Sequence, residues 1–287
     1  MLQAHIGAVE RVAGFANRLI RDHMPDQHRR FFAQLPFVVV ATVDGGGNPW
    51  ASLLTGDPGF ASSPEPRSLH LKATPHPEDP IGAGLRDGDA VGLLGIELET
   101  RRRNRMNGHA HPTDDGISVT VEHSFGNCPK YIHRRQVRRL PASQHAPAPA
   151  EHAETLTEAA RTWIARADTF YVGSYVDLSG GRQVDVSHRG GQPGFVNVDA
   201  DGVLTIPDFA GNRLFNTLGN FQANPRGALL FVDFQTGDTL QLTGTVALIL
   251  EGPQIAAFEG AQRLWQFHTT GLIHRRGAID LRASLIR

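Results

Sequence analysis

Residues 185–196 read Asp-Val-Ser-His-Arg-Gly-Gly-Gln-Pro-Gly-Phe-Val, and residues 207–220 read Pro-Asp-Phe-Ala-Gly-Asn-Arg-Leu-Phe-Asn-Thr-Leu-Gly-Asn, with a strand-like run between them. Amide, hydroxyl and cationic side chains are concentrated here between apolar strands, and buried polar groups need partners. Arg189 and Arg213 can fork onto phosphate oxygens. The groups available to complete such a shell are Ser187, Asn212, Asn216 and Thr217. The pattern favours an anion site; the alternative is a solvated hairpin followed by a polar helix start.

Part of this stretch occurs twice in the chain. Gly56-Asp57-Pro58-Gly59-Phe60 matches Gly191-Gln192-Pro193-Gly194-Phe195 at an offset of 135 residues, and residues 90–96 match residues 228–234 at nearly the same offset. A repeat of about 130 residues is much longer than the unit of a solenoid. Short strand-like runs punctuated by Gly and Pro are typical of barrels and sandwiches. We therefore expect a mainly β protein built from a duplicated β-barrel with flanking helices.

The repeat also predicts the domain organisation. Residues 1–140 are expected to form an N-terminal domain with a leading helix at 7–22, residues 141–150 a linker, and residues 151–287 a C-terminal domain that carries most of the site. Further helices are predicted over 28–35 and 155–167, and a short helix and a closing strand over 252–287. The first copy lacks the cationic side chains of the second, so it is expected to supply only the other wall of the site.

Composition limits the function classes. The net charge is -1, and 40% of residues are hydrophobic and 20% charged, which describes a globular protein with no global attraction to nucleic acid or membrane. A single cysteine excludes an intrachain disulfide, and no apolar run is long enough to span a bilayer. A cytoplasmic location is expected. The fourteen histidines show no metal-ligand spacing, so no metal site is predicted.

A second candidate segment is Ser124–His133, which contains one of only two lysines. Asn127 and Lys130 can donate to an anionic ligand while Tyr131 stacks or hydrogen-bonds; a proline turn that caps the barrel is the alternative. Cys128 is either a reactive thiol or, more commonly for a lone cysteine, a small buried group. The basic run 101–105 is expected to be a solvated strand start, with one or two side chains reaching the site.

These residues taken together resemble a known family. The 37–44 hairpin, the Gly-x-Pro-Gly-Phe loop, Ser187–Gly191, Asn216–Asn220 and Leu240–Gly244 are similar to segments of the FMN-binding split β-barrels related to pyridoxamine 5'-phosphate oxidase. The segment 125–132 (Phe-Gly-Asn-Cys-Pro-Lys-Tyr-Ile) resembles a signature of the two-barrel branch. The resemblance covers nearly the whole chain and implies a tandem duplication of a split β-barrel.

The resemblance also implies a ligand and a site. Members of the family bind FMN between two barrels, usually from two subunits, and here the two copies would form that pair. The Arg/Lys pair of the oxidase proper stands here as Asn212-Arg213, and its pattern for binding pyridoxal phosphate is not clear, so vitamin B6 synthesis is not expected. The FMN-binding residues that the motifs and the resemblance together predict are Asp185, Val186, Ser187, His188, Arg189, Asp208, Gly211, Asn212, Arg213, Asn216, Thr217, Asn220, Gln241, Asn127, Lys130 and Tyr131.

The function expected from this resemblance is that of an FMN-dependent oxidoreductase. It would act on a small molecule, with NAD(P)H as a candidate electron donor, and it would form a homodimer. His188 and Tyr131 are the candidate catalytic residues, for substrate protonation. The alternative is a non-catalytic flavin or haem carrier, sensor or haem-utilisation protein on the same fold; for a haem ligand the C-terminal stretch offers His268 and His274.

Overall fold

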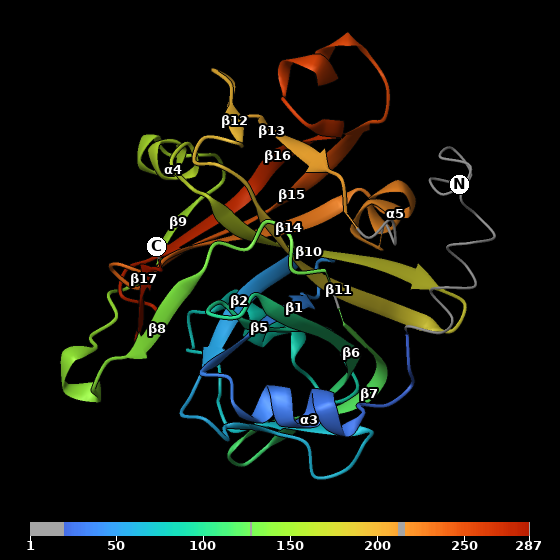
Figure 1. Cartoon of the computed structure of the whole chain (residues 1–287), viewed down its shortest axis with the longest axis vertical. Coiled ribbons are helices and arrows are strands. Elements are labelled where there is room, and N and C mark those ends of the chain that lie inside the picture. The colour runs from blue at the N-terminus through green and yellow to red at the C-terminus, as the bar shows by residue number, and fades with distance from the viewer. Residues whose placement is uncertain (1–19, 127, 212–215, 287) are drawn as a thin grey trace.

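The computed structural model describes residues 20–126, 128–211 and 216–286, and it consists mainly of two large antiparallel sheets (Figure 1). The first sheet has the strand order β2-β1-β5-β6-β7-β4-β3. Its strands are β1 (Phe37–Val43), β2 (Pro49–Thr55), β3 (Ala61–Ser62), β4 (Ser68–Leu71), β5 (Ala90–Glu97), β6 (Arg102–Thr113) and β7 (Gly116–Gly126).

The second sheet repeats this topology strand for strand. Its order is β11-β10-β14-β15-β16-β13-β12, and β9 (Glu151–Ala153) adds to β16. Its strands are β10 (Thr169–Leu178), β11 (Gly181–Gly190), β12 (Asn197–Val198), β13 (Leu204–Phe209), β14 (Arg226–Asp233), β15 (Asp238–Ile249) and β16 (Ala261–Arg275). Replacing β1–β7 by β10–β16 converts one order into the other. The fold is therefore the expected tandem duplication.

Local details repeat as well. Both long hairpins have a register shift at the same place, between Asn107 and Gly108 and between Thr243 and Gly244. A Cβ on Gly56 would lie 2.4 Å from Phe60, and one on Gly191 would lie 2.6 Å from Phe195. The matched Gly-x-Pro-Gly-Phe loops thus fold the aromatic ring back onto the glycine in both halves, which explains why the motif occurs twice.

Short helices and a small extra sheet complete the chain. The helices are α3 (Asp26–Ala33), η1 (Pro80–Gly84), η2 (Ala142–Gln144), α4 (Glu158–Ile164), α5 (Asn216–Ala223) and η3 (Pro253–Ala257), and β8 (Arg135–Arg139) pairs with β17 (Leu281–Leu285). None of the helices in the described ranges has the length and apolar character that crossing a bilayer requires.

The expected helices differ from these in their ends. The helix predicted over 155–167 begins only at Glu158, because Thr157 caps it by accepting a hydrogen bond from the Ala160 amide. The region 252–287 contains the 3-10 turn η3 and two strands rather than a helix and one strand. The helix predicted over 7–22 lies almost wholly outside the described residues; Arg21 forms a β-bridge with Ser124.

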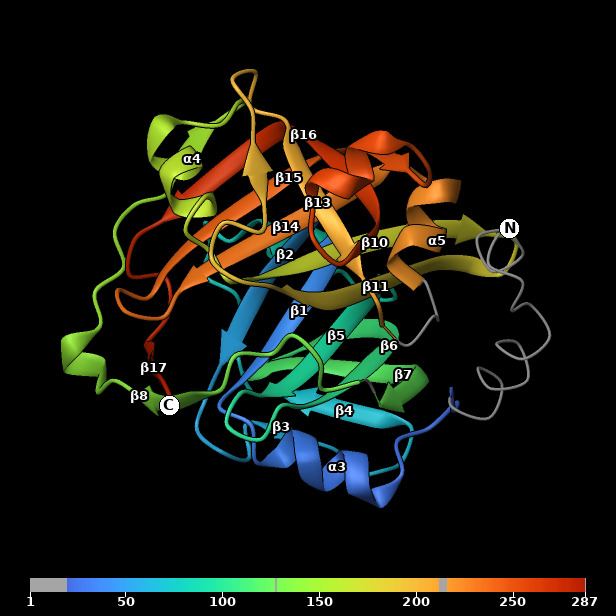
Figure 2. The same cartoon turned by 45° about the horizontal axis from the view of Figure 1, so that its top comes forward.

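The two sheets pack against each other through their most apolar strands. All seven residues of β1 are buried: Val38 and Val40 face the core of the first half, whereas Val39 and Ala41 face the second half. This two-sided burial explains the continuous apolar run in place of strict alternation. The close contact needs small residues, since a Cβ on Gly92 would lie 2.9 Å from the Asp185 backbone. Figure 2 shows β1, β2 and β5 of the first half against β10 and β11 of the second.

Candidate anion-binding pocket between the two halves

A pocket lies at the junction of the two halves. Strand β6 of the first half forms one wall, and the end of β11, the end of β13 and the start of α5 form the other. The segment that follows β7 also lines the pocket. The described residues that line the pocket are Arg103, Arg105, Cys128, Lys130, Tyr131, His188, Arg189, Gly190, Phe195, Pro207, Asp208, Phe209, Gly211, Asn216, Thr217 and Leu218.

Three arginines dominate the electrostatics of the pocket. Arg103 donates from Nε to the Cys128 carbonyl at 2.8 Å, and Arg105 donates to the Ser187 hydroxyl and, at 3.4 Å, to Asp185. Within the described ranges, Arg189 donates to the His188 carbonyl, at 3.4 Å. The Nε atoms of Arg105 and Arg189 have no partner among the described residues. Guanidinium donors without partners in a buried position fit an anionic ligand.

The pKa values of two of these arginines record the same shortage of negative charge. Burial, reinforced by Arg105 and Arg189, lowers the pKa of Arg103 well below the usual arginine value, to about 9. The pKa of Arg189 is also lowered, chiefly by burial, although Asp208 and Asp185 act in the opposite direction. Asp208 is itself engaged by Arg263 at 2.8 Å. A phosphate group would supply the missing counter-charge.

His188 contributes a neutral hydrogen-bonding group to the pocket. Its side chain is buried, with 3% of its surface exposed, and neither ring nitrogen has a partner among the described residues. Burial first, and then the charges of Arg103 and Arg189, hold its pKa well below 6.5. A neutral imidazole offers one donor and one acceptor. Unsatisfied in a buried position, it fits a polar ligand group.

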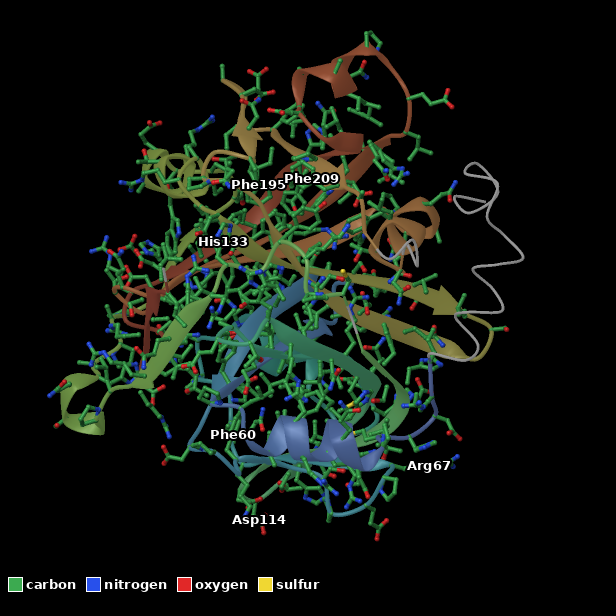
Figure 3. All side chains as sticks on the ribbon, viewed as in Figure 1. Phe60, Arg67, Asp114, His133, Phe195 and Phe209 are labelled. Atoms are coloured by element: carbon green, nitrogen blue, oxygen red, sulfur yellow. The ribbon has the colours of Figure 1, made fainter. Side chains whose placement is uncertain are left out.

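Aromatic side chains form the opposite wall. The rings of Tyr131 and Phe209 lie 5.4 Å apart at an interplanar angle of 30°, and the Tyr131 hydroxyl donates to the Ala210 carbonyl at 3.0 Å. Figure 3 shows Phe209 and Phe195 in the same part of the second half. Tyr131 has a φ of 64°, an uncommon conformation for a non-glycine residue. A Cβ on Gly190 would lie 2.1 Å from the Tyr131 carbonyl oxygen. Position 190 therefore requires glycine, because the backbone of the segment after β7 passes so close to it.

The start of α5 forms the polar floor. The Thr217 hydroxyl lies 2.9 Å from that of Ser187. An adjoining cavity is lined by Asp185, Asn216 and Asn220, together with Asn107 and other residues. Asn216 borders both cavities, which therefore meet at the start of α5.

Most of the residues predicted from the sequence come together here. The pocket or its adjoining cavity is lined by Asp185, His188, Arg189, Asp208, Gly211, Asn216, Thr217, Asn220, Lys130 and Tyr131, and Ser187 contacts Arg105 beside it. Val186 instead packs in the core between the halves. Gln241 bonds to the Ala51 carbonyl at 3.0 Å, away from the pocket residues. Asn127, Asn212 and Arg213 lie outside the described residues.

Several lining residues were not predicted individually. Arg103 and Arg105 belong to the basic run 101–105, where alternate residues of β6 point to the same side. Phe195 could have been found through the repeated loop; Phe209 and Pro207 carry no motif of their own. The ranges 20–126, 128–211 and 216–286 contain no group of three or more His, Cys, Asp or Glu that could hold a metal ion.

One family model matches most of the first half. Residues 24–145 match the family model described as pyridoxamine 5'-phosphate oxidase. The comparison with curated protein sequences gives no match.

Among solved structures, a HupZ protein of Group A Streptococcus is 15% identical, with a TM-score of 0.31, and the match covers 40% of this chain and 90% of that one. A FAD-binding protein of Mesorhizobium loti is 12% identical, with a TM-score of 0.27, and the match covers 44% of this chain and 97% of that one. A Clostridium acetobutylicum protein described as related to general stress protein 26, of the pyridoxinephosphate oxidase family, is 14% identical, with a TM-score of 0.31; the match covers 45% of this chain and 92% of that one. The family model therefore covers residues 24–145 alone, and the second half repeats the strand order of the first.

Proposed function

We propose that the chain binds FMN in the pocket between its two halves and is an FMN-dependent oxidoreductase that acts on a small molecule. The observation that carries the proposal is the cluster of Arg103, Arg105 and Arg189 in the pocket. The Nε atoms of Arg105 and Arg189, and both ring nitrogens of the buried His188, have no partner among the described residues. This combination calls for a ligand that is anionic at one end and polar but uncharged at the other. FMN has both features.

The residues present fit this cofactor. Arg103, Arg105 and Arg189 would hold the phosphate, since guanidinium groups recognise phosphate oxygens by paired hydrogen bonds. Phe209 and Tyr131 would supply a flat apolar wall for the ring system. When bound, the flavin supplies hydride or electron transfer, and the protein orients and shields it.

The two candidate catalytic residues are proposed to act mainly by positioning. His188 is neutral at physiological pH because its pKa is lowered well below 6.5, so it is suited to donate one hydrogen bond to the ligand rather than to act as an acid. Tyr131 already donates to the Ala210 carbonyl, which holds its ring against Phe209. A small-molecule substrate, NAD(P)H as electron donor and a homodimer in solution belong to the same proposal.

Titration of the protein with FMN, riboflavin and haem, followed by flavin fluorescence and by the haem absorbance band, tests the proposal. We expect FMN to bind more tightly than riboflavin, because riboflavin lacks the phosphate. Reduction of the bound flavin by NADH or NADPH would support an enzyme. A shifted haem band with no flavin binding would instead support the haem alternative. In that case His188 would be the histidine to test, because His268 and His274 do not line the pocket.

A further inference from the structure

The duplication places a second position between the two halves, related to the pocket by the repeat. Strand register defines its residues: Met106 pairs with Leu93 as Leu242 pairs with Leu229, so Gln241 corresponds to Arg105. Ser52 pairs with Val40 of β1 as Ser187 pairs with Val172 of β10, so Ser52 corresponds to Ser187. Helix η1 precedes β5 as α5 precedes β14.

A carboxylate fills this second position. Asp79, immediately before η1, accepts hydrogen bonds from the Ser52 hydroxyl at 2.5 Å and from Gln241 Nε2 at 3.2 Å. It also pairs with Arg275 of β16 at 2.6 Å. The exposed fractions are 6% for Asp79 and 4% for Arg275. A charge this deeply buried needs its partner, because removing one member leaves the other uncompensated.

The two positions therefore differ in how their polar and cationic side chains are partnered. In the pocket, Ser187 and Arg105 contact each other, and two arginine Nε atoms have no partner among the described residues. In the second position, Ser52, Gln241 and Arg275 all converge on one side-chain carboxylate. In the second position the anion is therefore a side chain of the protein itself, the Asp79 carboxylate of the first half.

We propose that Asp79 is a built-in anion that closes the second position, and that removal of its carboxylate converts the surroundings of Arg275 into an anion-binding site. The inference goes beyond the proposed function and does not require a flavin. It also implies that the second position of the wild-type chain is closed to an external anion. The probe that matches the missing group is formate, which is small enough to occupy the space that Asp79→Ala leaves.

Thermal unfolding of Asp79→Ala in sodium formate, compared with sodium chloride at equal ionic strength, tests the proposal. We expect the variant to unfold below the wild type in chloride and to regain about 3 °C or more in formate, as a ligand that binds only the folded state requires. Wild type should show no such difference between the salts. Asp280→Ala is the matched control: its partner Arg139 is partly exposed and retains Asp57, so formate should not restore it.

The double variant Asp79→Ala/Arg275→Met separates anion binding from general loss of structure. Without the buried cation it should unfold at a higher temperature than the single variant and lose the formate response. Recovery of folded Asp79→Ala from urea only when formate is present would equally support the proposal. Three results would overturn the proposal. The first is an unfolding temperature of Asp79→Ala that is the same in formate and chloride, and the second is a rise in formate that is equally large in the double variant. The third is a double variant that folds when Asp79→Ala folds in neither salt. A failure to bind flavin would leave every one of these readouts unchanged.

Discussion

Arg189→Met separates the phosphate-binding role of the arginine cluster from any structural role. Among the described residues, Arg189 donates one long hydrogen bond, to the His188 carbonyl at 3.4 Å, and its Nε has no partner there. Burial lowers its pKa, which means that holding the charged form costs folding free energy at neutral pH. Methionine keeps the apolar stem and removes this cost. The ligand-free variant should therefore unfold at the wild-type temperature or above it.

The effect on binding should be opposite in sign. A hydrogen bond to a charged group contributes about 1.5–3 kcal/mol, and each 1.4 kcal/mol is a tenfold change in affinity. We therefore expect Arg189→Met to weaken FMN binding by about 10- to 150-fold. Riboflavin binding should change little, because riboflavin has no phosphate for the guanidinium to contact.

Quenching of flavin fluorescence at fixed ionic strength measures both dissociation constants, and a melting curve measures stability. Lys72→Met is the matched control, since Lys72 is an exposed cation in the first half, outside the pocket lining. Equal loss of FMN and riboflavin binding would refute a contact with the phosphate. Unchanged FMN binding would show that the anion is held elsewhere.

Three further outcomes follow from the structure. Burial lowers the pKa of His28 from 6.5 to about 4, so as the pH falls this histidine takes up a proton in the unfolded chain before it does so in the folded protein. Wild type should therefore lose about 3 kcal/mol of unfolding free energy between pH 6.5 and pH 4 through this group. Urea unfolding should show a smaller loss over that range for His28→Gln. Because His188 is neutral above its lowered pKa, FMN affinity should show no inflection from this group between pH 6.5 and 8, and an inflection that His188→Gln abolishes would contradict its neutral state. Gly190→Ala should cost about 1–3 kcal/mol by overpacking, because its Cβ would meet the Tyr131 carbonyl at 2.1 Å, whereas Gly219→Ala in α5, with open space around it, should be neutral or stabilising in the same melting experiment.

The duplication could be predicted because both halves contain the same short sequence motif. Gly56 and Gly191 each lie too close to the phenylalanine of their own Gly-x-Pro-Gly-Phe loop to accept a Cβ. The same residues are therefore required in both halves, and the motif can be recognised twice in the sequence. The predicted match of residues 90–96 with 228–234 is wrong by two residues. Gly92 pairs with Ala41 as Ala228 pairs with Gly173, so Ala228 corresponds to Gly92 and not to Ala90. Hydrogen-bond register, which sequence similarity of apolar strands does not determine, fixes the true offset.

The candidate site was predictable where its residues follow one another along the chain. His188, Arg189, Asn216 and Thr217 belong to continuous polar stretches, and all four line the pocket. Arg105 comes from the other half, and its contact with Ser187 depends on how the two sheets pack. The packing of the sheets also decides the place of Gln241, which occupies the position of Arg105 in the repeat and donates to Asp79.

The buried Asp79–Arg275 pair was beyond reach of sequence reasoning. The two residues are separated by 196 positions, and neither lies in a motif. Asp79 follows a polar Pro-rich run that is typical of an exposed loop. Only the three-dimensional repeat shows that this loop stands where the other half has an open pocket.

Under the proposed function, the pocket between the two halves holds one FMN. The most direct test is the visible absorbance spectrum of the purified protein, taken before and after incubation with FMN and removal of unbound flavin by gel filtration. We expect flavin bands that stay with the protein and saturate at one FMN per chain. A protein that has no flavin bands as purified and retains none after incubation would contradict it.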